Sequence, residues 1–214
     1  MTGILFDLDG TLLDTLEDLT DATNYTLTRF GYPSRSCEQI RAALGNGAQT
    51  QLRRSLPEGT EESTIAQLLE VYKPYYTAHC QIKTKPYPGI PEALGILKER
   101  YPLAIVSNKP DSAVKALCAD YFPGIPAMGE IAGCPRKPAP DMVFRAMAAI
   151  GADRCVYVGD SEVDVQTAKN AGAACVAVLW GFRSRQALEA AGGTHLCPSP
   201  EKLADMIEEI IHGK

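Results

Sequence analysis

Short apolar runs separated by amphipathic stretches make up most of the chain. The runs predict buried β-strands at Ile4–Phe6, Leu103–Val106, Val156–Val158 and Cys175–Leu179. In the stretches between and after them, apolar residues recur every three to four positions, which is the spacing of one helix face. This spacing predicts helices at Pro91–Arg100, Asp111–Tyr121, Asp141–Ile150 and Glu201–Ile211. Continuous apolar strands that alternate with helices are typical of a parallel sheet covered on both faces, so we predict a Rossmann-like α/β core.

The segment after the first strand departs from this alternation. Between residues 14 and 86 the pattern shows no convincing strand and predicts helices instead. One apolar helical stripe runs from Leu16 to Phe30, and the following Gly31 is typical of a helix end. A second stripe runs from Ile65 to Tyr76. The long helical segment is therefore inserted between the first two strands of the sheet.

An insertion of this length is too long for a simple crossover between neighbouring strands, which favours two domains. We predict a Rossmann-like core made of residues 1–14 and 87–214 and a small α-helical domain at residues 15–86. Asp14 and Glu17 have the spacing of a capping box, which predicts that the first helix of the small domain begins at Asp14.

Charge and cysteine content narrow the class of protein. The chain of 214 residues has 21 Lys and Arg against 26 Asp and Glu, a net charge of −5, which argues against a nucleic-acid-binding protein. Its seven cysteines form no CxxC pair, so the sequence does not indicate a zinc site. The cysteines are instead expected to be free thiols in a reducing compartment. No signal peptide or membrane-length apolar run is found, so we expect a cytoplasmic monomer or homodimer without membrane contact.

Polar residues follow the predicted strands at the edge where a parallel sheet binds ligands. Ligands of open α/β sheets bind beyond the carboxyl ends of the strands. The side chains expected there are Asp7, Asp9, Ser107, Asn108, Lys137, Asp160 and Asp164. Clustered carboxylates suit a hard divalent cation, and Mg²⁺ uses one or two carboxylates together with a substrate phosphate. We therefore expect a Mg²⁺ site at this edge of the sheet.

The same residues form four motifs in a recognisable order. The motifs are Asp7-x-Asp9-Gly10-Thr11-Leu12-Leu13-Asp14, Ser107-Asn108, Lys137-Pro138 and Gly159-Asp160-x-x-x-Asp164. Together they resemble the motifs of the haloacid dehalogenase superfamily, and the inserted helices resemble its small cap domain. Two further stretches resemble the phosphoglycolate phosphatase branch, namely Leu44-Gly45-Asn46-Gly47 and Trp180-Gly181-Phe182-Arg183. The resemblance implies a Mg²⁺-dependent phosphatase for a small-metabolite phosphomonoester, with 2-phosphoglycolate as the first candidate.

The resemblance also implies a role for each motif residue. Asp7 would attack phosphorus and become an aspartyl phosphate, and Asp9 would serve as general acid and then general base. Ser107 would donate to a phosphoryl oxygen, and Lys137 would add a positive charge at the nucleophile. The implied metal site comprises Asp7, the main-chain carbonyl of Asp9, Asp160 and, through a bound water, Asp164.

Several of these residues have a purely structural interpretation as well. Asp164 fits a capping box with Ser161 and could simply begin a helix. The Gly45-Asn46-Gly47 stretch predicts either a substrate-facing loop or an ordinary helix-terminating turn. Candidate substrate contacts are therefore Asn108, Gly45, Asn46 and Gly47, and candidate partners for a substrate carboxylate are Arg41, Arg53 and Arg54. Trp180 and Phe182 are interpreted as residues that anchor their loop.

Alternative functions remain open at this point. Within the family they are a phosphate-transferring mutase resembling β-phosphoglucomutase, a pyrophosphatase and a nucleotidase. A dehalogenase is disfavoured, because Asp9 supplies the acid and base that phosphate chemistry needs. A non-catalytic binding or regulatory protein is the alternative from another class, and the presence of both Asp7 and Asp9 argues against it.

Overall fold

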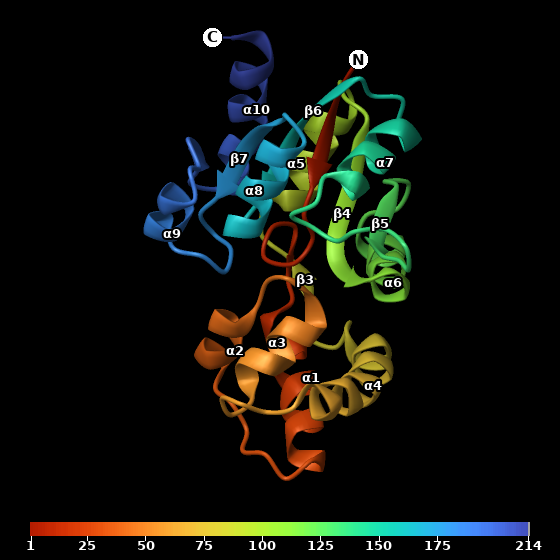
Figure 1. The fold of residues 1–214 in the computed structure, drawn as a ribbon. Coiled ribbons are helices and arrows are strands. Elements are labelled where there is room, and N and C mark those ends of the chain that lie inside the picture. The colour runs from red at the N-terminus through yellow and green to blue at the C-terminus, as the bar shows by residue number, and fades with distance from the viewer. Residues whose placement is uncertain (214) are drawn as a thin grey trace.

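A six-stranded parallel sheet lies at the centre of the larger part of the molecule (Figure 1). The computed structural model describes residues 1–213, and its strand order is β5-β4-β1-β6-β7-β8. The strands are β1 (Thr2–Phe6), β4 (Leu103–Pro110), β5 (Ala127–Glu130), β6 (Arg154–Gly159), β7 (Ala174–Val178) and β8 (His195–Cys197). The four strands predicted from apolar runs are the four central ones. The α/β prediction is confirmed, whereas the edge strands β5 and β8 were not predicted.

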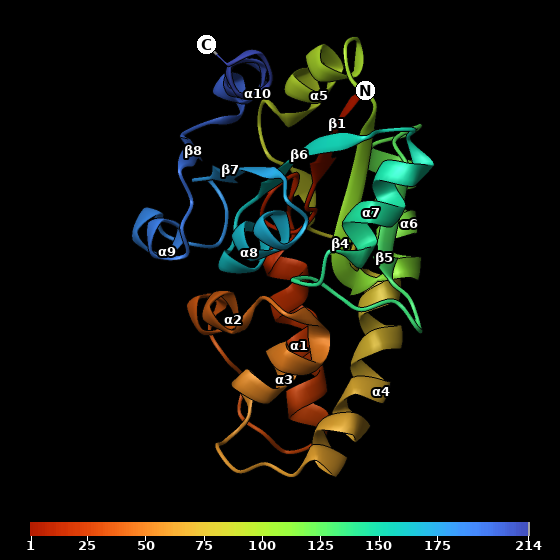
Figure 2. The same cartoon turned by 45° about the horizontal axis from the view of Figure 1, so that its top comes forward.

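Helices cover both faces of the sheet. On one face lie α5 (Ile90–Lys98), α6 (Asp111–Tyr121) and α10 (Leu203–His212), and on the other α7 (Asp141–Ala149) and α8 (Glu162–Asn170). Figure 2 shows α7 and α8 in front of the sheet, with α5 and α10 at its upper end. Because successive strand residues point to opposite faces, Ile4 and Phe6 pack into the first of these layers and Leu5 into the second. The short α9 (Arg185–Ala190) follows β7 and packs near α8.

Four helices form a separate group below the carboxyl ends of the strands (Figure 1). They are α1 (Leu16–Arg29), α2 (Cys37–Ala43), α3 (Gly47–Ser55) and α4 (Glu62–His79). The helix end predicted at Gly31 is confirmed, since its φ is 77° and the next residue, Tyr32, donates from N–H to the Leu27 carbonyl. The predicted capping box at Asp14 is wrong. The N-cap of the helix is Thr15, one residue later than predicted.

The two segments that connect the helical group to the sheet are held against each other. They form an antiparallel ladder of β2 (Leu13–Asp14) with β3 (Lys85–Pro86), where the sequence predicted no strand. Beside the ladder, the carboxylate of Asp18 accepts hydrogen bonds from the main-chain N–H of Lys83 at 3.0 Å and of Thr84 at 2.9 Å. The Thr84 hydroxyl donates to the same carboxylate at 2.8 Å. The first turn of α1 is thereby fixed to the returning chain.

Two chain-wide expectations concern membrane contact and cysteine state. Within residues 1–213 no helix is both long enough and apolar enough to cross a membrane. The longest helix, α4, carries Glu70 and Lys73 and has Pro74 in its interior. All seven cysteines are free thiols.

Candidate active site

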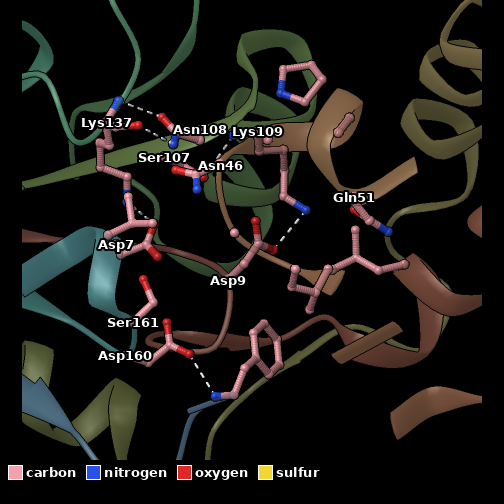
Figure 3. A pocket seen from close by; sticks show the side chains of 18 of the residues that line it. Asp7, Asp9, Asn46, Gln51, Ser107, Asn108, Lys109, Lys137, Asp160 and Ser161 are labelled. Carbon is pink, nitrogen blue, oxygen red and sulfur yellow. Dashed lines mark hydrogen bonds and ion pairs between the residues drawn. The ribbon is translucent and has the colours of Figure 1, made fainter. Parts of the chain in front are cut away.

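The motif residues converge on one cavity between the sheet and the helical group (Figure 3). Asp7 directly follows β1, Ser107 lies in the last part of β4, and Asp160 directly follows β6. The cavity encloses about 90 Å³. The predicted site residues that line it are Asp7, Asp9, Gly45, Asn46, Gly47, Ser107, Asn108, Lys137 and Asp160. Asp164 is fully buried and does not line the cavity.

Lys137 joins two of the acidic residues. Its Nζ lies 2.8 Å from Asp7 Oδ1 and 2.8 Å from Asp164 Oδ1. Burial opposes its charge, but the charges of Asp164 and Asp7 raise the pKa of Lys137 well above its usual value, so it stays an ammonium. Asn108 fixes the main chain here, because its Oδ1 accepts from the Lys137 N–H at 2.8 Å and its Nδ2 donates to the Lys137 carbonyl at 2.9 Å. The Asn108 amide is therefore engaged by protein, and its role as a substrate contact stays a prediction.

Asp160 is held in a tightly packed turn. Its Oδ2 accepts from the main-chain N–H of Phe182 at 2.7 Å, and the Thr11 hydroxyl lies 3.4 Å from its Oδ1. A Cβ on Gly10 would lie 2.4 Å from Asp160 Oδ2, and one on Gly181 would lie 2.3 Å from its Cβ. Glycine is required at both positions, which explains why the first motif and the Trp180–Arg183 stretch each carry one.

Three of these carboxylates form an acidic cluster. One oxygen each from Asp7, Asp160 and Asp164 lies within 4.8 Å of the others. Burial and the charge of Asp164 raise the pKa of Asp7 to about 7 and that of Asp160 well above its usual range. When all are ionised, three carboxylates against the one ammonium of Lys137 leave two surplus negative charges. That surplus and the all-oxygen donor set fit a hard divalent cation.

Asp164 combines the two interpretations that the sequence left open. Its Oδ2 accepts from the Ser161 N–H at 3.1 Å and from the Ser161 hydroxyl at 2.6 Å, which is the predicted helix-starting contact of α8. Its Oδ1 faces Lys137 and completes the acidic cluster. The residue therefore takes part in the capping box of α8 and in the acidic cluster.

The Asp9 side chain points away from the acidic cluster. Its Oδ1 lies 2.8 Å from the Nζ of Lys109, a buried lysine at the end of β4. The same ammonium contacts the hydroxyl of Tyr76 from α4 and lies 4.3 Å from the centre of its ring. Lys109 directly follows the Ser107-Asn108 motif, and this position is a sequence signal that could have identified it. Tyr76 was predicted as part of an apolar stripe, and its second role at the cavity was missed.

Two arginines from loops beside the sheet donate hydrogen bonds to the main chain of the helical group. Arg183 donates to the carbonyls of Arg41 at 3.0 Å and Leu44 at 2.5 Å, and its Nε lies 2.8 Å from Glu162. Arg136 donates to the Asn46 carbonyl at 3.1 Å. These contacts keep the loop before α3 over the cavity.

The arginines proposed from sequence for a substrate carboxylate lie elsewhere. None of the three lines the cavity, and Arg53 instead pairs with Glu62 at 2.6 Å on the surface. Trp180 anchors its loop as expected, with Nε1 donating to the Thr11 carbonyl at 2.9 Å. Phe182 also packs against the core cluster as expected, and it lines the cavity as well.

The sheet order, the helical insertion after β1 and the acidic cluster at the carboxyl ends define a hydrolase of the haloacid dehalogenase type. The chain belongs to the haloacid dehalogenase-like hydrolase family, whose model matches residues 4–178. Over 190 residues it is 36% identical to the phosphoglycolate phosphatase of Pseudomonas savastanoi pv. phaseolicola. This alignment covers 84% of this chain and 70% of that protein. Over 193 residues it is 32% identical to the phosphoglycolate phosphatase of Aquifex aeolicus, covering 85% and 86%.

A solved structure gives the same result. The crystal structure of a candidate phosphoglycolate phosphatase from Lactobacillus delbrueckii subsp. bulgaricus matches with a TM-score of 0.91 and 39% identity, over 96% of this chain and 98% of that chain. Together these similarities confirm the family and branch predicted from the motifs, and the prediction of a phosphoric monoester hydrolase.

Proposed function

We propose that the chain is a Mg²⁺-dependent phosphatase that hydrolyses 2-phosphoglycolate. The observation that carries the proposal is the arrangement of the two acids after β1. Asp7 forms an ion pair with Lys137, and Asp9 points toward Lys109 in the same cavity. The names of the relatives support this substrate. So does the size of the cavity, because about 90 Å³ is far below the roughly 300–1,000 Å³ of pockets for larger ligands. A nucleotide is disfavoured on the same ground.

The acidic cluster would hold the metal ion. Its ligands would be the carboxylates of Asp7 and Asp160 and the main-chain carbonyl of Asp9, with Asp164 oriented toward a metal-bound water. When bound, Mg²⁺ supplies charge neutralisation between the attacking carboxylate and the anionic phosphate. The two surplus negative charges of the cluster support a divalent ion.

The protein groups carry the reaction in two displacements. An Asp7 oxygen forms a bond to phosphorus while the bond from phosphorus to the ester oxygen breaks, and Asp9 gives its proton to the departing alkoxide. Asp9 then takes a proton from water, the water oxygen attacks phosphorus, and the bond to Asp7 breaks to release inorganic phosphate. Lys137 and Ser107 hold the phosphoryl oxygens through both steps.

A panel of phosphorylated substrates tests the proposal. Phosphate release would be measured with 2-phosphoglycolate, β-glucose 1-phosphate, pyrophosphate and a nucleoside monophosphate, in Mg²⁺ and in EDTA, and compared as kcat/KM. We expect 2-phosphoglycolate to rank first and EDTA to abolish turnover. Asp7→Asn should lower kcat by more than about 10³-fold while the unfolding midpoint stays unchanged.

Each alternative has its own result in this panel. Isomerisation of β-glucose 1-phosphate without phosphate release identifies a mutase, and a higher kcat/KM for pyrophosphate or the nucleotide identifies the corresponding hydrolase. Absence of metal-dependent turnover with every ester refutes the enzyme and favours a binding protein.

A further inference from the structure

Three cationic side chains line the cavity within the described chain, and two of them already have other roles. They are Lys109, Lys137 and Arg183. Lys137 lies between Asp7 and Asp164, where the phosphate is bound in the proposed function. Arg183 pairs with Glu162 and donates to two main-chain carbonyls of the helical group. Lys109 is the cation that remains for another part of a substrate.

The ammonium of Lys109 has donor capacity left over. It carries three protons, and among residues 1–213 it donates a hydrogen bond to the Tyr76 hydroxyl and forms an ion pair with the Asp9 carboxylate at 2.8 Å. The side chain is 3% exposed, so bulk water does not readily supply a third acceptor. A buried charged donor without an acceptor is unfavourable, and an anionic ligand group at this place would satisfy it.

The position of Lys109 matches the shape of the proposed substrate. Its Nζ is 2.8 Å from Asp9, on the side of Asp9 away from Asp7 and Asp160 (Figure 3). Asp9 must reach the ester oxygen to protonate it. In 2-phosphoglycolate a single carbon separates that oxygen from the carboxylate. Asp9 and Lys109, which are in contact, therefore match the ester oxygen and the carboxylate of the substrate, which are one carbon apart.

The walls around Lys109 strengthen an ionic contact there. The helical group contributes the apolar and aromatic residues Leu19, Ala48, Tyr72 and Tyr76 to the cavity lining, and of these Tyr76 contacts Lys109 directly. Apolar and aromatic walls exclude water, and charges attract each other more strongly in such surroundings than in bulk water. The cation also lies beside Asp9, so it offsets the repulsion that Asp9 would otherwise exert on an incoming carboxylate.

We propose that Lys109 determines substrate specificity by binding the carboxylate of the leaving group, with the Tyr76 hydroxyl holding its ammonium in place. The inference rests on the proposed function and adds the residue that recognises the part of the substrate beyond the phosphate. It assigns to Lys109 the role for which the sequence had suggested Arg41, Arg53 and Arg54.

The test compares two esters that differ in one group. Ethyl phosphate has a methyl group where 2-phosphoglycolate has its carboxylate, and the phosphate ends are identical. The measured quantity is the ratio of kcat/KM for 2-phosphoglycolate to kcat/KM for ethyl phosphate. For Lys109→Met we expect this ratio to fall by roughly 10- to 100-fold, the factor of a charge-assisted hydrogen bond. Lys109→Arg should restore part of it, and Lys115→Met, on the exposed face of α6, should leave it unchanged.

The outcomes separate this inference from the proposed function. If Lys109→Met lowers kcat/KM for both esters by the same factor, Lys109 only positions Asp9 and the inference is overturned, while the proposed function stands. If the wild-type enzyme shows no preference for 2-phosphoglycolate, the proposed substrate and the inference both fail.

A second measurement needs no variant and remains decisive if Lys109→Met does not fold. The non-hydrolysable 3-phosphonopropionate carries the carboxylate, and propylphosphonate carries a methyl group in its place. We expect the first to inhibit the wild-type enzyme roughly 10-fold or more tightly than the second. Equal inhibition constants would overturn carboxylate recognition.

Discussion

Replacing Asp18 by asparagine tests how the two connecting segments are held. The Asp18 carboxylate is 3% exposed and accepts from the main-chain N–H groups of Lys83 and Thr84 and from the Thr84 hydroxyl. An asparagine keeps the shape but has one acceptor oxygen. The Lys83 N–H lies 3.0 Å from both Asp18 oxygens, so with the asparagine oxygen toward Thr84 this N–H keeps one neutral acceptor but also faces the NH₂ group, which is a donor.

The expected cost follows from these contacts. Hydrogen bonds to a charged group contribute about 1 kcal/mol more than neutral ones, and three are affected here, so we expect Asp18→Asn to lower the free energy of unfolding by about 2–3 kcal/mol. For a chain of this size that corresponds to a fall in Tm of roughly 4–12 °C.

A matched control lies one turn further along α1. Asp21 contacts the same segment through the Lys83 side chain at 2.8 Å, but its side chain is 54% exposed. Asp21→Asn should therefore cost less than about 1 kcal/mol. The assay is urea unfolding of metal-free protein followed by circular dichroism. Equal losses in the two variants would refute the reasoning that buried main-chain contacts of Asp18 fasten the connection.

Three further predictions concern the cavity. Because the folded-state pKa of Asp7 is raised to about 7, the folded protein holds this proton more tightly than the unfolded one, and metal-free stability should fall as pH rises from about 4 to about 7. Mg²⁺ should then raise Tm more at about pH 7.5 than at about pH 5.5, and equal shifts would contradict this competition. Lys137→Met leaves Asp7 and Asp164 without their cation and should lower the unfolding free energy of the metal-free protein by about 3–5 kcal/mol, as measured by urea unfolding. A variant as stable as the wild type would contradict this role of Lys137. Arg183→Met removes donors to the helical group and should raise KM roughly tenfold in steady-state kinetics, while Arg185→Met, an exposed neighbour, should not.

The sheet was predictable where its strands are buried on both faces. The central strands β1, β4, β6 and β7 have continuous apolar runs, because helices cover both of their sides. The edge strand β5 has the sequence Ala-Met-Gly-Glu, and β8 has three residues, so neither shows a period. The β2–β3 ladder joins residues far apart in the chain, and no local pattern reports such a pairing.

The site divides in the same way. Residues within one motif, such as Asp7 and Asp9, are identified by local order at the end of a strand. The partnership of Lys109 with Asp9 and Tyr76 joins three separate elements and became visible only from the fold. Charge alone also misled: Arg53 has the right sign for a substrate carboxylate, but it forms a surface ion pair with Glu62.

Arg183 and Arg136 donate hydrogen bonds to main-chain carbonyls of the helical group, and this affects which side chains in that group can be replaced. Arg183 and Arg136 donate to the main chain at Leu44 and Asn46, whatever side chains those positions carry. Changes of side chain in this loop therefore need not remove the attachment. Gly45 and Gly47, with φ of 98° and 81°, are positions that such redesign should leave as glycine, and Asn46, with φ of 58°, favours residues that accept the left-handed region.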